Sequence, residues 1–237
     1  MGRAFEYRRK SKEARWDKMS KVFPKLAKSI TIAVKEGGGP DPESNSKLRL
    51  AIANAKAENM PKDNVDKAIA RATGKDAAEI VEIHYEGKGP HGSMLWVECA
   101  ADNTNRTVAS LKTILNKNGG EMVNSGALSF LFTRKAVVEF QTTSEMDLEE
   151  VELELIDHGL EDFVEHQGLV TVTGEFTAFG ALTEAVEKLG ITTTKTSLKM
   201  LPTSPIELSE AQMEEVESLI DKLEDDEDVQ AVYTNIA

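Results

Sequence analysis

The apolar residues in the first third of the chain recur at the spacing of a helix. From Met19 onward they fall three and four residues apart, which predicts one continuous apolar stripe on a helix. Because proline is tolerated only in the first turn of a helix or at a kink, we expect the regular helix to begin near Pro24. The glycines at 37–39 and the prolines that follow them end it.

Two shorter helices follow in the same third of the chain. Apolar residues from Leu48 to Ala55 share one face of the second helix, and those from Val65 to Ala72 share one face of the third. Pro61 is placed to open the third helix. Three amphipathic helices of this length pack naturally as a small bundle.

Past the bundle, the pattern changes to short strands alternating with helices. Around a glycine-rich turn we expect two strands, followed by a helix and a further strand, over residues 79–85, 94–99, 104–118 and 128–132. Residues 136–201 then read as strand, helix, strand, strand, helix and strand, which is the ferredoxin-like order. A helix begun by a capping box of Ser209 and Gln212, and a strand over 229–236, complete the chain.

These elements predict an α+β fold with three domains. Residues 1–76 form a basic helical bundle, and residues 135–205 form a ferredoxin-like β-α-β-β-α-β domain. The last helix and strand are left over from that domain, and they can complete the sheet begun by the earlier strands. We therefore expect a discontinuous α/β domain, made of 77–134 and 206–237, into which the ferredoxin-like domain is inserted.

Composition narrows the class of protein. Of the 237 residues, 40% are apolar, which is enough to build packed cores and too much for a disordered chain. The single cysteine, Cys99, excludes an internal disulfide framework and a cysteine-built metal site. No apolar run approaches the ~20 residues of a membrane span, and the first residues lack the apolar segment of a secretory signal. We therefore expect a soluble, cytoplasmic protein.

Charge is distributed unevenly along the chain. The formal net charge is −13, yet residues 1–75 carry 18 Lys and Arg against 9 Asp and Glu, a net charge of +9. The remaining residues carry a net charge of −22. A basic module joined to an acidic body presents one positive surface to a polyanion, which indicates nucleic-acid binding. The alternative is that the asymmetry serves solubility or the internal docking of modules.

The sequence contains no constellation of catalytic residues. Gly87, Gly89 and Gly92 match a dinucleotide-binding spacing, but they lie between two strands and not between a strand and a helix, which favours a turn. The four histidines include no pair at the helical spacing of a metal site. We interpret the acidic run at 224–228 as a solvated loop. We expect no enzymatic activity, cofactor, metal site or small-molecule substrate.

Three groups of basic residues are the candidate nucleic-acid contacts, because lysine and arginine neutralise phosphates with little regard to sequence. The first group lies on the first helix opposite its apolar stripe, and the second lies on the arm before that helix. The third lies at the starts of the two later helices, where backbone N–H groups bind anions. In that order the groups are Lys18, Lys21, Lys25 and Lys28; Arg8, Arg9, Lys10 and Lys12; and Lys47, Arg49 and Lys62.

Ordinary surface roles are the alternative for these residues. Lysine-rich helix faces are commonly solvated, and the third group has Asp63 and Asp66 nearby in the sequence for pairing. Arg106 also begins a helix, and Asp102 is placed to pair with it.

Two motifs of the bundle resemble the signature of the YebC/PmpR family. They are Asn45-Ser46-Lys47-Leu48-Arg49 and Asn59-Met60-Pro61-Lys62-Asp63. Further matches extend to the last strand, among them Tyr85-Glu86-Gly87, Asn105-Arg106-Thr107 and Asp228-Val229-Gln230. The opening segment departs from the family pattern, because Arg3-Ala4-Phe5 stands where the family has a small residue, a basic residue and Trp.

The resemblance implies a helical N-terminal bundle, an α/β domain with a ferredoxin-like insertion, no enzymatic activity and no cofactor. Family members are described as DNA-binding transcriptional regulators in bacteria, and a mitochondrial branch is described as a translational activator. Together with the charge, this predicts a DNA-binding regulator whose acidic domains face basic protein partners, with no membrane partner. The alternative is a ribosome-associated translation factor that binds rRNA, because phosphate-directed lysine and arginine serve both polymers.

Overall fold

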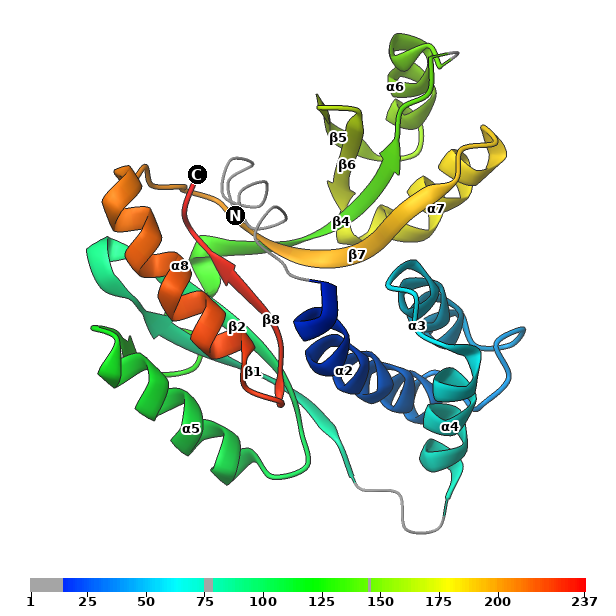
Figure 1. Cartoon of the computed structure of the whole chain (residues 1–237). Coiled ribbons are helices and arrows are strands. Elements are labelled where there is room, and N and C mark those ends of the chain that lie inside the picture. Colours follow the sequence, from blue (N-terminus) through cyan, green and yellow to red (C-terminus); the bar gives the residue numbers. More distant parts are fainter. Residues whose placement is uncertain (1–14, 75–78, 145) are drawn as a thin grey trace. The chain divides into compact units, whose positions relative to one another are not determined.

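The computed structural model describes residues 15–74, 79–144 and 146–237, and the side chains from residue 21 onward within those ranges (Figure 1). The chain divides into two compact units. The first unit comprises Met1–Phe132 and Pro202–Ala237, and the second comprises Thr133–Leu201. In the described ranges, no helix has the length and apolar character needed to cross a membrane.

The helices α2 (Arg15–Glu36), α3 (Ser46–Ala57) and α4 (Lys62–Thr73) open the first unit. Their apolar faces form one core that includes Ile30, Leu48, Ala55, Val65 and Ala68. The prediction that the first helix begins near Pro24 is wrong: α2 begins at Arg15, and Pro24 lies inside it. A proline in a helix removes one backbone hydrogen bond, while the bonds of the turns on either side remain available to hold the helix.

Asn45 fixes the start of α3. Its side-chain oxygen accepts a hydrogen bond from the backbone N–H of Leu48 at 2.9 Å, which is the usual N-cap geometry. Its amide nitrogen donates to the carbonyls of Ala33 and Gly39, both at 2.8 Å. One buried side chain therefore ties the end of α2 to the beginning of α3.

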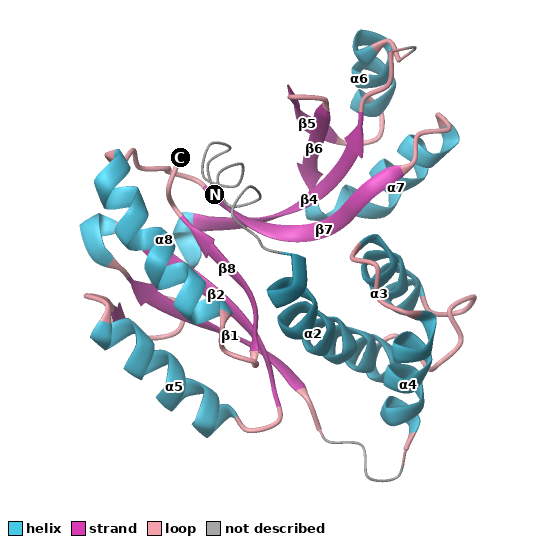
Figure 2. Ribbon diagram, viewed as in Figure 1, coloured by secondary structure: helices cyan, strands magenta, loops and turns pink. Residues whose placement is uncertain are grey.

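The remainder of the first unit is a sheet covered on one face by two helices. Its strands are β1 (Val81–Lys88), β2 (Met94–Ala101), β3 (Glu121–Met122) and β8 (Val229–Thr234), in the order β3-β1-β2-β8. The helices α5 (Thr104–Lys117) and α8 (Glu210–Glu224) lie against one face of this sheet (Figure 2). Their buried side chains there include Leu111, Leu115, Leu219 and Ile220. The capping box of Ser209 and Gln212 at the start of α8 is confirmed.

The strand predicted over 128–132 is wrong in most of its length. Ser129–Leu131 is a turn of 3-10 helix (η2), and a strand begins only at Phe132. The reason lies in a buried carboxylate: Glu86 accepts hydrogen bonds from the backbone N–H groups of Gly126 at 2.6 Å and Leu128 at 2.5 Å. These bonds hold the backbone before η2 in a turn conformation instead of a strand ladder.

The second unit alternates strands and helices in the predicted ferredoxin-like order. Along the chain these are β4 (Phe132–Gln141), α6 (Leu148–Ile156), β5 (Leu160–His166), β6 (Leu169–Glu175), α7 (Phe179–Lys188) and β7 (Thr193–Pro202). The sheet order is β5-β6-β4-β7, and its core includes Val138, Phe140, Leu155, Val172 and Leu182. The mixed α/β class with N-terminal helices followed by sheets is confirmed, whereas the division into three domains stays a prediction.

Candidate nucleic-acid interface

Three lysines of the predicted phosphate-binding stripe contact a loop of the same unit. This segment, residues 224–228, comprises the last residue of α8 and the loop that joins it to β8, and we call it the acidic loop. Lys21 Nζ lies 2.6 Å from Asp225 Oδ1, and Lys25 Nζ donates to the backbone carbonyl of Glu224 at 2.6 Å. We call Lys21, Lys25 and Lys28 the docked lysines.

Lys28 makes the innermost of these contacts. Its ammonium group donates to Asp228 Oδ1 at 2.7 Å, to the carbonyl of Glu227 at 2.8 Å and to the carbonyl of Ala100 at 3.3 Å. The side chain of Lys28 is 22% exposed and that of Asp228 only 2%. An ammonium group has three N–H donors, so these acceptors occupy its full donor capacity.

Asp228 collects donors from two other directions. Thr107 Oγ1 donates to Asp228 Oδ2 at 2.8 Å, and Arg106 Nη2 lies 3.2 Å from the same oxygen. Burial by itself raises the pKa of a carboxyl group, but the hydrogen bonds from Lys28, Thr107 and Arg106 outweigh it and lower the pKa of Asp228. The carboxylate is therefore held in its charged form.

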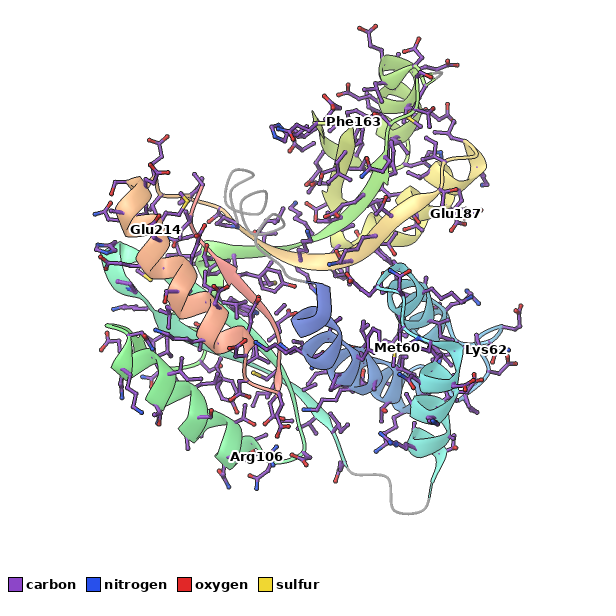
Figure 3. The ribbon with its side chains drawn as sticks, in the orientation of Figure 1. Met60, Lys62, Arg106, Phe163, Glu187 and Glu214 are labelled. Carbon is purple, nitrogen blue, oxygen red and sulfur yellow. The ribbon has the colours of Figure 1, made fainter. Side chains whose placement is uncertain are left out.

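Arg106 lies at the start of α5 (Figure 3). It is within ion-pair distance of three carboxylates. Its Nη2 lies 2.8 Å from Asp102, 3.2 Å from Asp228 and 3.7 Å from Glu227. The hydrogen bond to Asp228 raises the pKa of the guanidinium further above its ordinary value. The expected pairing of Arg106 with Asp102 is present, and the two acidic-loop carboxylates add to it.

The acidic loop offers the chemical groups that a phosphate backbone would offer. It combines carboxylates with the backbone carbonyl of Glu224 at the end of α8, where the helix dipole is negative. Interpreting the run at 224–228 as a solvated loop is wrong for Asp228, which is buried. The pairing between the lysines of α2 and the acidic loop was not predicted from the sequence. The opposite charges of the two segments were a signal that could have suggested it.

The third predicted group lies at the starts of α3 and α4. Lys47 pairs with Glu36 at 2.9 Å, with both side chains about half exposed. The guanidinium of Arg49 donates to the carbonyls of Pro42 and Glu43 at 2.8 and 3.1 Å. Lys62 is exposed in the first turn of α4 (Figure 3), and among the described residues no carboxylate lies within ion-pair distance of it. The alternative pairing with Asp63 or Asp66 is therefore not observed.

The remaining predicted contacts cannot be placed. Arg8, Arg9, Lys10 and Lys12 lie outside the described residues, and Lys18 is in the part of α2 whose side chains are not described. The predicted contacts whose side chains are described thus fall into two sets: the docked lysines, and the exposed group of Lys47, Arg49 and Lys62. The nucleic-acid role of all of them stays a prediction.

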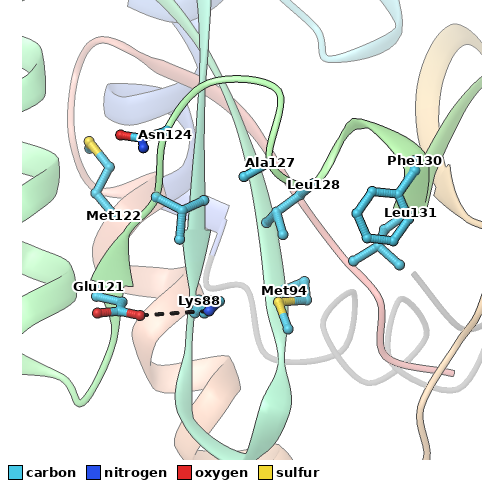
Figure 4. Close-up of a pocket in the computed structure, with 10 residues that line it drawn as sticks. Lys88, Met94, Glu121, Met122, Asn124, Ala127, Leu128, Phe130 and Leu131 are labelled. Atoms are coloured by element: carbon cyan, nitrogen blue, oxygen red, sulfur yellow. Dashed lines mark ion pairs between the residues drawn. The ribbon is translucent and has the colours of Figure 1, made fainter.

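A depression in the first unit has a different character. It is lined by β1, β2, β3 and the segment that follows β3, with Met94, Met122, Leu128 and the 72% exposed Phe130 among its residues (Figure 4). Lys88 and Glu121 form a 3.9 Å ion pair at its edge. Within the described ranges, no group of three His, Cys, Asp or Glu side chains is arranged to bind a metal ion.

Comparison with known proteins supplies the class of the molecule. Residues 3–75 match the model of the TACO1/YebC protein N-terminal domain, and residues 80–236 match that of the TACO1/YebC second and third domain. The chain belongs to the TACO1/YebC family, as the motifs at Asn45 and Asn59 had suggested.

Individual relatives cover the whole chain. It is 62% identical to a probable transcriptional regulatory protein of Campylobacter curvus and 58% identical to one of Wolinella succinogenes, with 100% of both chains covered in each case. Among solved structures, a conserved hypothetical protein from Aquifex aeolicus matches with a TM-score of 0.83 and 33% identity. That match covers 93% of this chain and 90% of the Aquifex chain.

Proposed function

We propose that this protein is a cytoplasmic, DNA-binding transcriptional regulator that holds nucleic acid through its basic helical bundle. The observation that carries the proposal is the exposed group at the starts of α3 and α4, Lys47, Arg49 and Lys62, on a module whose net charge is +9. The name "probable transcriptional regulatory protein" given to full-length relatives supports the same function.

The chemistry of this group suits phosphate contacts. The guanidinium of Arg49 uses Nη1 on turn carbonyls, which fixes the side chain on the surface at the start of α3. The only recorded partner of Lys47 in the described structure is an exposed carboxylate, and exposed ion pairs are worth only about 0–1 kcal/mol. A phosphate can therefore replace Glu36 at little energetic cost.

The first turn of α4 adds a further anion-binding element. Its N-cap, Pro61, supplies no side-chain hydrogen bond, and its carbonyl accepts from the N–H of Asn64 at 2.9 Å. In the described structure this leaves the N–H groups of Lys62 and Asp63 for an external acceptor. Lys62 stands at this position. These contacts read phosphate and not bases, so we propose that base-specific contacts, where they exist, come from elsewhere in the protein.

We assign the acidic remainder of the molecule to protein contacts and not to catalysis. On α6 the exposed residues include Glu149, Glu150, Glu152 and Glu154, a surface of the opposite sign to the bundle. Such a surface is repelled by nucleic acid and attracts basic proteins. In this proposal the protein needs no cofactor and performs no chemical step.

The test is a tagged pull-down from bacterial lysate at low salt. Wild type is compared with the variant Lys47→Glu/Arg49→Glu/Lys62→Glu, and with a matched control, Lys112→Glu/Lys117→Glu/Lys188→Glu, whose residues are exposed on α5 and α7. Each eluate is assayed for DNA and rRNA, with and without DNase or RNase. The exposed group is a sharper target than the docked lysines, because its own contacts are all at the exposed surface, whereas reversal of Lys28 would break an ion pair with the buried Asp228.

The expected result is DNA retained by wild type and the control, lost on DNase treatment and lost from the exposed-group variant. Retention of rRNA in intact ribosomal subunits, lost from the same variant, would instead identify a translation factor. Equal retention by all three proteins would contradict the assignment of the bundle.

A further inference from the structure

We propose that the acidic loop is an internal competitor of nucleic acid: it occupies the docked lysines in place of phosphate, so nucleic acid reaches them only when α2 leaves the loop. This inference rests on the proposed function, because it concerns the same basic bundle. It adds to that function a closed state of the protein in which part of the basic surface is withheld.

The spacing of the contacts supports competition. Lys21, Lys25 and Lys28 lie four and three residues apart, which places them on one face of α2. Each meets a different oxygen of the loop, at 2.6, 2.6 and 2.7 Å. A row of lysines facing a row of anionic and carbonyl oxygens is the arrangement that a phosphate backbone would also require.

The donor capacity of the lysines makes the two partners mutually exclusive. The ammonium of Lys28 already donates to three oxygens, so a phosphate can bind it only by displacing at least one of them. Asp225 is itself an anion beside Lys21, and it repels any phosphate that approaches that lysine. Nucleic acid and the acidic loop therefore cannot bind the docked lysines at the same time.

The contact between α2 and the acidic loop can open without disrupting either apolar core of the first unit. The apolar core of the bundle and the apolar core of the sheet with α5 and α8 are separate clusters. Hydrogen bonds and ion pairs connect α2 to the segment 224–230, including a hydrogen bond from Ser29 to Gln230 at 3.2 Å. The outermost pair is 48% and 59% exposed at Lys21 and Asp225, which makes it weak and salt-sensitive.

The consequence is a reduced affinity for nucleic acid in the closed state. When only a fraction of molecules is open, the measured dissociation constant is raised by the inverse of that fraction. A partner that engages the acidic loop, or a change that neutralises it, then strengthens nucleic-acid binding without touching the nucleic-acid surface.

A reversible lock tests this directly. In Lys21→Cys/Asp225→Cys the two thiols replace a contacting pair, and a short bis-maleimide joins them, with the native Cys99 buried and wild type treated alike as the control. Binding to a 30-base-pair DNA duplex and to an rRNA fragment is measured for the linked and unlinked forms of this one variant. Their lysines and carboxylates are the same, so electrostatics cannot mimic the effect.

The linked form is expected to bind the duplex about tenfold more weakly or worse, because two further lysines stay on the loop. Equal binding of linked and unlinked forms overturns the competition and leaves the proposed function standing. Failure of both thiols to join, with each labelled singly, overturns it as well. Absence of binding by wild type and by every variant overturns the proposed function and this inference together.

A second variant approaches the question without cysteines. Asp225→Asn/Glu227→Gln removes two exposed charges of the loop and keeps the buried Asp228, while Glu149→Gln/Glu152→Gln on α6 removes the same charge elsewhere. The loop variant is expected to bind the duplex about threefold more tightly or better, and the α6 control to change by less. Equal effects of the two would show that net charge alone is responsible and contradict the competition.

Discussion

Lys28 and Asp228 lie 200 residues apart in the chain and form an ion pair of 2.7 Å between Nζ and Oδ1. The pair joins the helical bundle to the end of the acidic loop. Because Asp228 also accepts a hydrogen bond from Thr107, it connects α2 to α5 through one buried carboxylate. A lysine selected from the sequence for phosphate binding is thus part of the internal packing of the protein.

Replacing Asp228 by Asn should destabilise the first unit. The neutral amide loses the charged hydrogen bonds from Lys28 and Arg106, and hydrogen bonds to charged groups are worth about 1.5–3 kcal/mol each. We expect the free energy of unfolding, measured in urea, to fall by about 2 kcal/mol. The control Asp221→Asn, an exposed residue of α8, should change it by less than about 0.5 kcal/mol.

The same carboxylate should contribute to acid sensitivity. The pKa of Asp228 is lower in the folded protein than the ordinary value of about 3.9, so its stabilisation is complete above that value and is lost as the pH falls through the folded pKa. Urea unfolding of wild type and Asp228→Asn, measured from pH 7 downward, should show a stability difference that shrinks below about pH 5. A difference that stays constant into strong acid would contradict the charged state assigned to Asp228.

Local signals in the sequence predicted local structure well. The capping box of Ser209 and Gln212 marked the start of α8 correctly, because both partners of that motif lie within one turn. The order of elements in the second unit followed from the hydrophobic period together with the glycines that end its helices and mark its turn. Pro24 misled because proline penalises a helix interior without forbidding it, and here nine residues of α2 precede it.

Features that depend on distant residues escaped prediction. The turn at Ser129–Leu131 depends on Glu86, about forty residues earlier, and the residues over 128–132 are mostly apolar and suit a strand. The sequence placed the lysines of α2 on one face of the helix, but their partner, the acidic loop, lies at the other end of the chain. Internal docking was among the alternatives for the charge asymmetry, and periodicity cannot identify which residues meet.

Glu86 should stabilise the turn conformation of the segment before η2. Glu86→Ala leaves the N–H groups of Gly126 and Leu128 without their acceptor, and of the two only Leu128 is buried. An unsatisfied buried group costs about 1–3 kcal/mol, and the exposed Gly126 can turn to water. We expect a loss of about 1–3 kcal/mol in the free energy of unfolding, together with faster hydrogen exchange at those two amides. Glu82→Ala, exposed on the same strand, is the control, and unchanged exchange at Gly126 and Leu128 would refute the role of Glu86.

Cys99 should be nearly inert in the folded protein. Burial, with the nearby carboxylates of Asp226 and Asp228, raises the pKa of its thiol to about 12. The reactive thiolate is therefore scarce at pH 8, and a disulfide reagent should modify native protein far more slowly than protein unfolded in urea. Equal rates in the two states would show that the sheet around β2 opens readily.

The salt dependence of DNA binding tests the central claim most directly, because each phosphate contact adds about 0.9 to the slope of log affinity against log salt concentration. The duplex affinities of wild type, Lys47→Glu/Arg49→Glu/Lys62→Glu and Lys112→Glu/Lys117→Glu/Lys188→Glu are measured from low to physiological salt. The account predicts a steep slope for wild type and the α5–α7 control, and a slope lower by about three for the exposed-group variant. Identical slopes for all three proteins would contradict nucleic-acid binding through the starts of α3 and α4.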